Sequence, residues 1–217
     1  MNLFRALLTV SGFTLLSRVT GLARETLIAR AFGASQYTDA FYVAFRIPNL
    51  LRRISAEGAF SQAFVPILAE FKNQQGHDAT KALVDATSTV LAWALAVLSL
   101  VGVLGASGVV FVVASGLAHE GQAYALAVTM TRIMFPYIIF ISLTSLASGV
   151  LNTYKNFSLP AFAPVLLNVS FIVAAVFFAP RMHTPVYALA WAVIAGGLLQ
   201  FVVQLPGLKK IDMVPRI

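Results

Sequence analysis

The stretch ATSTVLAWALAVLSLVGVLGASGVVFVVASGLA, residues Ala86–Ala118, decides the fold class because it carries no charged side chain. A helix needs about 20 consecutive apolar residues to span the hydrocarbon core of a bilayer, and this stretch exceeds that length. Three further charge-free runs of more than about 20 residues follow it: Ile133–Tyr154, Asn156–Pro180 and Met182–Leu208. The four runs predict transmembrane helices and therefore an all-α, polytopic membrane helix bundle.

The composition of the whole chain agrees with this prediction. Hydrophobic residues make up 59% of the sequence and charged residues 11%, and the mean hydropathy is +0.85. Soluble domains carry roughly 25% charged residues, so this chain lacks the polar surface to face water on all sides. The sequence has no cysteine, which excludes a disulfide framework and a cysteine-based metal site.

Turn and breaker residues divide the chain into six predicted membrane segments. The first begins like a signal peptide, but Arg18 stands where a cleavage site is expected, so we interpret it as a retained helix. Residues 1–207 then form one transmembrane lobe. The six segments lie near 4–32, 36–70, 82–114, 121–152, 158–180 and 185–206.

Basic residues between these segments indicate the orientation of the chain. With the N-terminus inside the cell, the outer loops hold only Arg181. The inner loops and tails then hold Arg5, Lys72, Lys81, Lys155, Lys209, Lys210 and Arg216. Because cytoplasmic loops of membrane proteins carry an excess of Lys and Arg, both ends of the chain are predicted to be cytoplasmic. The same bias accounts for the net charge of +7 without a nucleic-acid partner.

The second segment, 36–70, is too long for one straight span. A helix of that length would run roughly 50 Å against a hydrocarbon core of about 30 Å. Pro48 and Gly58 are natural break points, because proline removes a backbone donor and glycine loosens the helix. We therefore expect a bent or broken second helix with Pro48 as a hinge, and we expect Gly12 and Gly21 to be hinges of the first segment.

The first two segments carry an unusual cluster of charges. It consists of Arg18, Arg24, Glu25, Arg30, Asp39, Arg46, Arg52, Arg53 and Glu57. A membrane-embedded arginine costs about 2.5–3.5 kcal/mol on insertion scales, so the deeper ones require a polar cavity. Arginines remain in surplus even if every carboxylate pairs once, and their planar fork suits phosphate oxygens. The cluster predicts a membrane-embedded anion site that fits a diphosphate.

Helical spacing leaves a second interpretation open for part of this cluster. Residues three, four or seven positions apart lie on one face of a helix. Arg18 and Glu25 are so related, and so are Arg53 and Glu57. Structural ion pairs are therefore an alternative to ligand binding, with even weight for Arg53 and Arg46 and less for Arg18, Arg24 and Arg52.

Several motifs resemble those of the MurJ (MviN) family of lipid II flippases, within the MOP transporter superfamily. They are SRVTGLARE at Ser17–Glu25, FRIPNLLRR at Phe45–Arg53 and EGAFSQAFVP at Glu57–Pro66, and the likeness continues through the later segments. The resemblance implies the N-terminal lobe of a two-lobed transporter with a central cavity. Residues 208–217 would begin a cytoplasmic linker to a second lobe missing from this fragment, and that lobe would carry the sodium site.

The resemblance also implies a function. The family flips lipid II, the undecaprenyl-diphosphate-linked peptidoglycan precursor, from the cytoplasmic to the periplasmic leaflet of the bacterial inner membrane by alternating access. It implies headgroup contacts by Arg18, Arg24, Arg52, Glu25 and Asp39. Secondary or structural roles fall to Arg53, Glu57, Arg46 and Asn49. Lipid II and membrane lipids are the expected partners, with no cofactor and no metal.

Two other functions are compatible with parts of the sequence. One is an ion-coupled exporter of another polyprenyl-linked glycan or of a small molecule, which shares the fold without needing the arginine surplus. The other is a membrane-embedded polyprenyl-diphosphate phosphatase. The sequence lacks an HExxH, a G-x-S-x-G and a P-loop motif, and its three histidines, His77, His119 and His183, are scattered and expected to be solvated. We therefore predict that the protein is not an enzyme.

Overall fold

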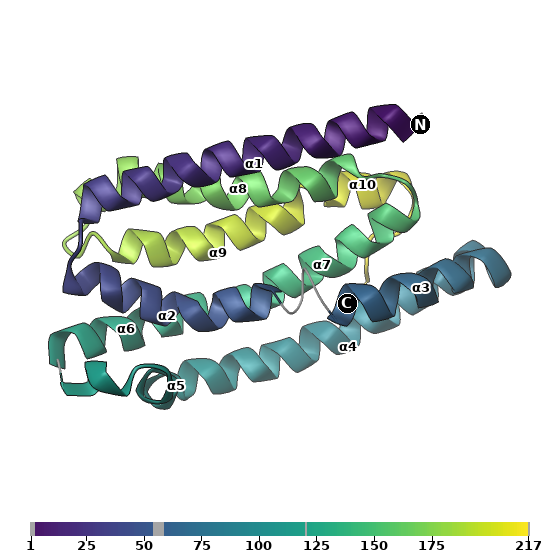
Figure 1. Cartoon of the computed structure of the whole chain (residues 1–217). Coiled ribbons are helices and arrows are strands. Elements are labelled where there is room, and N and C mark those ends of the chain that lie inside the picture. The colour runs from purple at the N-terminus through teal and green to yellow at the C-terminus, as the bar shows by residue number, and fades with distance from the viewer. Residues whose placement is uncertain (1–2, 54–58, 120, 217) are drawn as a thin grey trace.

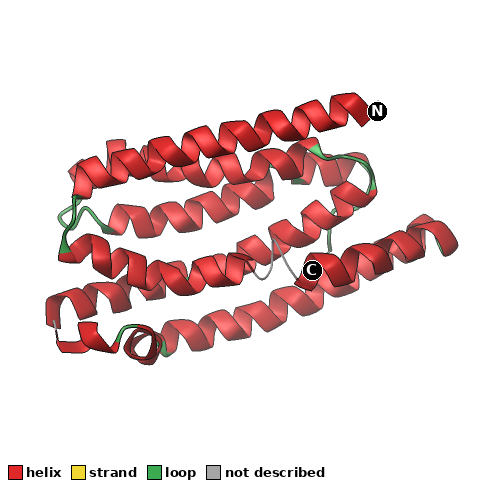
Figure 2. Ribbon diagram, viewed as in Figure 1, coloured by secondary structure: helices red, strands yellow, loops and turns green. Residues whose placement is uncertain are grey.

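The computed structural model describes residues 3–53, 59–119 and 121–216, and every regular element in these ranges is helical (Figure 2). The predicted all-α class is confirmed. The elements are α1 Leu3–Phe32, α2 Gln36–Arg52, α3 Ala59–Gln74, α4 Gly76–Leu104, α5 Ala106–Val113, η2 Ser115–His119, α6 Gly121–Met134, α7 Tyr137–Thr153, α8 Ser158–Val173, the π-helical η3 Ala174–Phe178, η4 Ala179–Arg181, α9 Tyr187–Val202 and α10 Leu205–Lys210.

The helices run up and down, and their connections gather at two ends of the bundle (Figure 1). The N-terminus, the α3–α4 and α7–α8 connections and α10 share one end, and the α1–α2 and η4–α9 connections lie at the other. Gly33 and Gly76 form turns with φ of +62° and +83°, a backbone conformation that glycine adopts without steric cost. Ser35 then caps α2, because its hydroxyl accepts a hydrogen bond from the Thr38 amide at 3.4 Å.

Four stretches of the described chain are long and apolar enough to cross a membrane. They are Gly76–Leu104, Gly121–Thr153, Ser158–Arg181 and Tyr187–Lys210. The chain is thus a multi-pass membrane protein. The more strongly charged α1 and the shorter α2 are not among these stretches, yet they run alongside them in the bundle (Figure 1).

The second predicted segment is divided, although not at Pro48. Helix α2 continues through Pro48 to Arg52, and α3 begins at Ala59, so the helix does not break at the proline. Pro48 is buried, and a transmembrane helix tolerates proline because neighbouring groups can satisfy the freed carbonyl. The other predicted break point, Gly58, lies outside the described residues.

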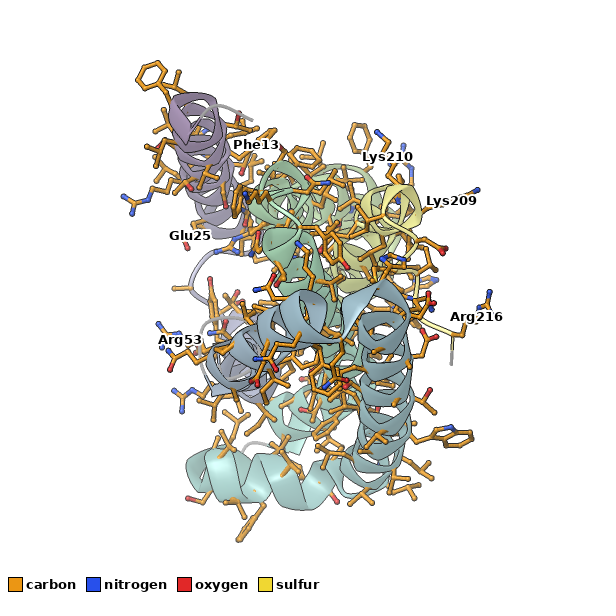
Figure 3. The ribbon with its side chains drawn as sticks, turned by 90° about the vertical axis from the view of Figure 1, so that its right-hand side faces the viewer. Phe13, Glu25, Arg53, Lys209, Lys210 and Arg216 are labelled. Carbon is orange, nitrogen blue, oxygen red and sulfur yellow. The ribbon has the colours of Figure 1, made fainter. Side chains whose placement is uncertain are left out.

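Five helices form an arc around a common interior. Helix α1 packs on α8, α8 on α9, α9 on α7, and α7 on α2, which leaves α1 and α2 as the two ends of the arc (Figure 3). Small residues allow the close approach at its centre. A Cβ atom at Gly197 of α9 would lie 2.6 Å from the ring of Tyr137 of α7, and one at Gly196 would lie 2.6 Å from Leu167 of α8.

Candidate functional site

A cavity of about 670 Å³ opens inside the arc and is lined by α1, α2, α7, α8 and α9. Its lining consists of Ser17, Arg24, Tyr42, Phe45, Asn49, Ile141, Thr144, Ser145, Ser148, Asn152, Pro160, Ala163, Pro164, Leu167, Asn168 and Gln200. Among the described residues, Arg24 is the one charged side chain in this lining. The lining follows α7 as far as Asn152 in its last turn, so the cavity reaches the end of the bundle that holds the N-terminus.

The guanidinium of Arg24 is held on three sides. Its Nη1 donates a hydrogen bond to Oδ1 of Asn168 at 3.1 Å, and its Nη2 donates to Oε1 of Glu25 at 2.9 Å. Its Cζ lies 5.4 Å from the centre of the Phe171 ring, within the range of a cation–π contact. These contacts use two of the five N–H donors of the guanidinium within the described structure, so donors remain for a ligand.

Asn168 joins α8 to α1 and fixes Arg24 at the same time. While its Oδ1 accepts from Arg24, its Nδ2 donates to the backbone carbonyl of Ser17 at 2.9 Å and to Oγ1 of Thr20 at 3.2 Å. The residue is 7% exposed, so water competes little for these bonds. Gly21 lies alongside, where a Cβ atom would be 3.5 Å from Nδ2 of Asn168, an ordinary contact.

The remaining polar wall is uncharged. Thr144, Ser148 and Asn152 of α7 are spaced by four residues and therefore share one face of the helix. Gln200 of α9 lies beside them in the lining. The cavity thus combines one fixed cation with hydroxyl and amide groups, an arrangement suited to an anionic ligand that also carries neutral polar groups.

The predicted site residues are spread over different environments. Arg24 and Asn49 line the cavity, and Glu25 reaches it through its bond to Arg24. Glu25 thus pairs with Arg24, the residue before it in the sequence. Arg18, which helical spacing placed on the same face as Glu25, is exposed. Glu25 and Arg53 lie on the same side of the bundle, that of α1 and α2 (Figure 3).

The other predicted residues lie outside the lining. Asp39 in the first turn of α2, Arg46 and Arg53 are exposed. The side chain of Arg52 and the whole of Glu57 fall outside the described residues. The predicted hinges Gly12 and Gly21 lie within the continuous helix α1. The ligand roles of the charged residues and the hinge roles of the two glycines stay predictions.

His77 and His183 are exposed, as the prediction that they are solvated requires. The side chain of His119 is not part of the described structure.

Apart from Asn49, sequence reasoning missed the neutral members of the site. Asn168, Thr144 and Gln200 are uncharged residues inside long charge-free runs, so the charge pattern gives no signal of them. The four-residue spacing of Thr144, Ser148 and Asn152 is a signal that could have found one wall, because buried polar side chains in a membrane segment mark its protein-facing or cavity-facing side.

Comparisons with known proteins agree with this architecture. A family model described as lipid II flippase MurJ matches residues 28–217. The lipid II flippase MurJ of Burkholderia cenocepacia is 88% identical over 217 residues, which are 100% of this chain and 42% of that protein. A probable lipid II flippase MurJ of Buchnera aphidicola from Acyrthosiphon pisum is 44% identical over 214 residues, covering 99% of this chain and 42% of that relative.

A solved structure gives the same result at the level of the fold. It is titled lipid II flippase MurJ, inward closed conformation, and it aligns with a TM-score of 0.78 and 26% identity over 93% of this chain and 42% of its own. This chain therefore spans less than half the length of the proteins it matches. Because the family model covers residues 28–217, the chain belongs to the lipid II flippase MurJ family.

Proposed function

We propose that this chain takes part in moving lipid II from the cytoplasmic to the periplasmic leaflet of the bacterial inner membrane by alternating access. The observation that carries the proposal is Arg24, a fixed cation with unused donors in the lining of a polar cavity. Names of close relatives as lipid II flippases support the choice of substrate. The protein acts as a transporter and not as an enzyme.

In this proposal the diphosphate of lipid II binds Arg24 in competition with Glu25. The Glu25 side chain is 66% exposed, and an ion pair so accessible to water contributes little free energy. A diphosphate offers several oxygens to the guanidinium fork and forms charge-assisted, bidentate hydrogen bonds. Asn168 keeps the guanidinium in place as the two anions exchange, because it accepts from Nη1 of Arg24 whereas Glu25 accepts from Nη2.

The basic residues support entry from the cytoplasmic side. Lys72, Lys155, Lys209 and Lys210 lie near the end of the bundle that the cavity lining reaches at Asn152. The positive-inside rule assigns this end to the cytoplasm, and with it both ends of the chain. The headgroup would enter there while the prenyl tail stays in lipid. A second lobe, with its sodium site, would complete the cavity.

Charge reversal at Arg24 tests the proposal. A chimera in which these 217 residues replace the matching segment of the Burkholderia cenocepacia relative supplies a chain of the relatives' length. Reconstituted in vesicles, the chimera should flip lipid II, and Arg24→Glu should abolish flipping. Arg24→Lys should keep part of it, because the charge remains but the bidentate fork is lost.

The matched control is Arg181→Glu. Arg181 is an exposed arginine at the opposite end of the bundle, where it donates to the Phe177 carbonyl. Its reversal should leave flipping unchanged. Flipping by the Arg24→Glu chimera at the unaltered rate would show that the cavity arginine does not bind the headgroup.

A further inference from the structure

Two aromatic side chains of α2, Tyr42 and Phe45, belong to the lining of the cavity. They are three residues apart and therefore lie on one face of the helix. Tyr42 is 50% exposed, so a ligand in the cavity can reach its ring. No other described residue of the lining is aromatic. We call these two residues the aromatic wall.

Buried rings hold the aromatic wall in place. The Phe45 ring stacks on Phe41, with ring centres 5.6 Å apart and 10° between the planes, and it meets Phe171 edge to face at 6.0 Å. The Tyr42 ring also contacts Phe41, with ring centres 5.6 Å apart. Phe41 and Phe171 are each 2% exposed, so both belong to the core of the bundle. The aromatic wall is therefore a preformed apolar surface.

The aromatic wall lies beside the Arg24 site. Phe171 contacts both, because its ring lies 5.4 Å from Cζ of Arg24 and 6.0 Å from the Phe45 ring. Arg24 lies eight residues before the end of α1, and Phe45 lies nine residues after the start of α2. From the rise of an α-helix, both lie about 12–14 Å from the α1–α2 connection, and thus at a similar depth in the bundle. A group attached to a diphosphate on Arg24 is therefore within reach of the wall.

The chemistry of the wall differs from that of the Arg24 site. The face of an aromatic ring carries partial negative charge, so it attracts C–H groups and cations and repels phosphate oxygens. A sugar ring presents C–H groups on its faces, and these stack on an aromatic ring while the sugar hydroxyls stay free for polar groups. Only the Tyr42 hydroxyl could donate to a phosphate, and phenylalanine at this position lacks that hydroxyl but keeps the ring.

We propose that Tyr42 and Phe45 bind a sugar ring of the headgroup by stacking, beside the Arg24 site for the diphosphate. The inference rests on the proposed function, because in lipid II a sugar is attached directly to the diphosphate. A headgroup whose phosphates bind Arg24 places that sugar next to the wall. The wall thereby favours polyprenyl diphosphates that carry a sugar over those that end at the phosphate.

Two substitutions of Tyr42 in the chimera test the wall. Tyr42→Leu removes the ring, whereas Tyr42→Phe keeps the ring and removes the hydroxyl. The side chain is half exposed, so both variants should fold, which a Tm measurement checks. The probes are undecaprenyl diphosphate, the same lipid bearing one N-acetylated sugar, and lipid II. Tyr42→Leu should weaken binding of the two sugar-bearing lipids roughly three- to tenfold and leave binding of undecaprenyl diphosphate unchanged. Tyr42→Phe should bind all three lipids as the unaltered chimera does.

Tyr37→Leu is the matched control. Tyr37 is a tyrosine of the same helix, 38% exposed and outside the cavity lining, so this variant should keep all three affinities. Weaker binding of undecaprenyl diphosphate by Tyr42→Leu overturns the proposal, because the ring would then contact the prenyl chain or the phosphates. An equal loss in Tyr42→Phe assigns the contact to the hydroxyl and also overturns it.

Arg24→Glu separates this inference from the proposed function. It should weaken binding of all three lipids, because each of them carries the diphosphate. If Arg24→Glu weakens all three and Tyr42→Leu weakens none, the proposed function stands and the aromatic wall is refuted. If Arg24→Glu leaves all three unchanged, the proposed function fails, whatever the Tyr42 variants do.

Discussion

Replacing Asn168 with leucine tests whether one amide holds α1 against the rest of the arc. Leucine has a similar volume, so the change removes hydrogen bonds without creating a large cavity. Three bonds are lost: those to the Ser17 carbonyl and to Thr20, and the one accepted from Arg24. A neutral hydrogen bond contributes about 1 kcal/mol and one to a charged group about 1.5–3 kcal/mol. Because Thr20 keeps its bond to the Leu16 carbonyl, we expect a loss of about 2–4 kcal/mol in the docking of α1.

Hydrogen–deuterium exchange of the α1 amides measures this loss. Each 1.4 kcal/mol corresponds to a factor of about ten, so exchange over residues 17–24 should accelerate by roughly 30-fold to several hundredfold. Ser170→Ala is the matched control on the same helix, because within the described residues the Ser170 hydroxyl bonds to the Leu166 carbonyl of α8 and to no group of α1. The α1 amides of the Ser170→Ala protein should exchange at the same rate as those of the unaltered protein. Unchanged exchange in the Asn168→Leu protein would refute the view that this amide anchors α1.

Three further predictions concern other parts of the bundle. Gly197→Ala should lower the free energy of unfolding by about 1–3 kcal/mol, because the added Cβ would lie 2.6 Å from the Tyr137 ring. Gly108 has open space around it, so Gly108→Ala should raise the free energy of unfolding by up to about 1 kcal/mol. Chemical unfolding that ranks the two variants in the opposite order contradicts this prediction. Asp85→Ala should speed amide exchange at Arg216, whose backbone N–H donates to Asp85 at 3.0 Å, and equal exchange would show that this bond does not hold the C-terminal segment. Glu25→Gln should tighten the binding of inorganic diphosphate about two- to fivefold by removing an exposed competing anion, and weaker binding would show that Glu25 assists the ligand.

The helical class and the four apolar spans could be predicted, because charge-free runs in the sequence mark these spans. The turns at Gly33 and Gly76 have the positive φ that glycine adopts without steric cost. Interruptions within a run were harder to predict. Helix α4 ends before Gly105, and α6 ends before Phe135 and Pro136. Glycine and proline are local signals there, but Gly21 and Pro48 lie inside continuous helices, so the residue type alone does not decide where a helix ends.

Of the residues that line the cavity, Arg24 and Asn49 were predicted from the sequence. Helical spacing places residues on a common face, but it does not say which face meets the cavity. Arg18 and Arg24 both belong to the predicted cluster, yet Arg24 lines the cavity and Arg18 is exposed. The difference arises from α8, which brings Asn168 to the side of α1 that carries Arg24. A contact between residues so far apart in the chain is not visible in local periodicity.

The amide at position 168 also determines how much of the Arg24 charge is available to a ligand. An amide accepts from the guanidinium without neutralising it, and its other end donates to the Ser17 carbonyl at 2.9 Å. A second carboxylate on Arg24, less exposed than Glu25, would oppose an incoming anion by about 3–4 kcal/mol at an effective dielectric constant near 20. Asn168→Asp should therefore weaken diphosphate binding at least about tenfold. The second oxygen of the aspartate would face the Ser17 carbonyl and could not donate to it. The exchange rate of the α1 amides should therefore lie between that of the unaltered protein and that of the Asn168→Leu protein. Diphosphate binding of unaltered strength in Asn168→Asp would mean that the free charge of Arg24 does not hold the anion.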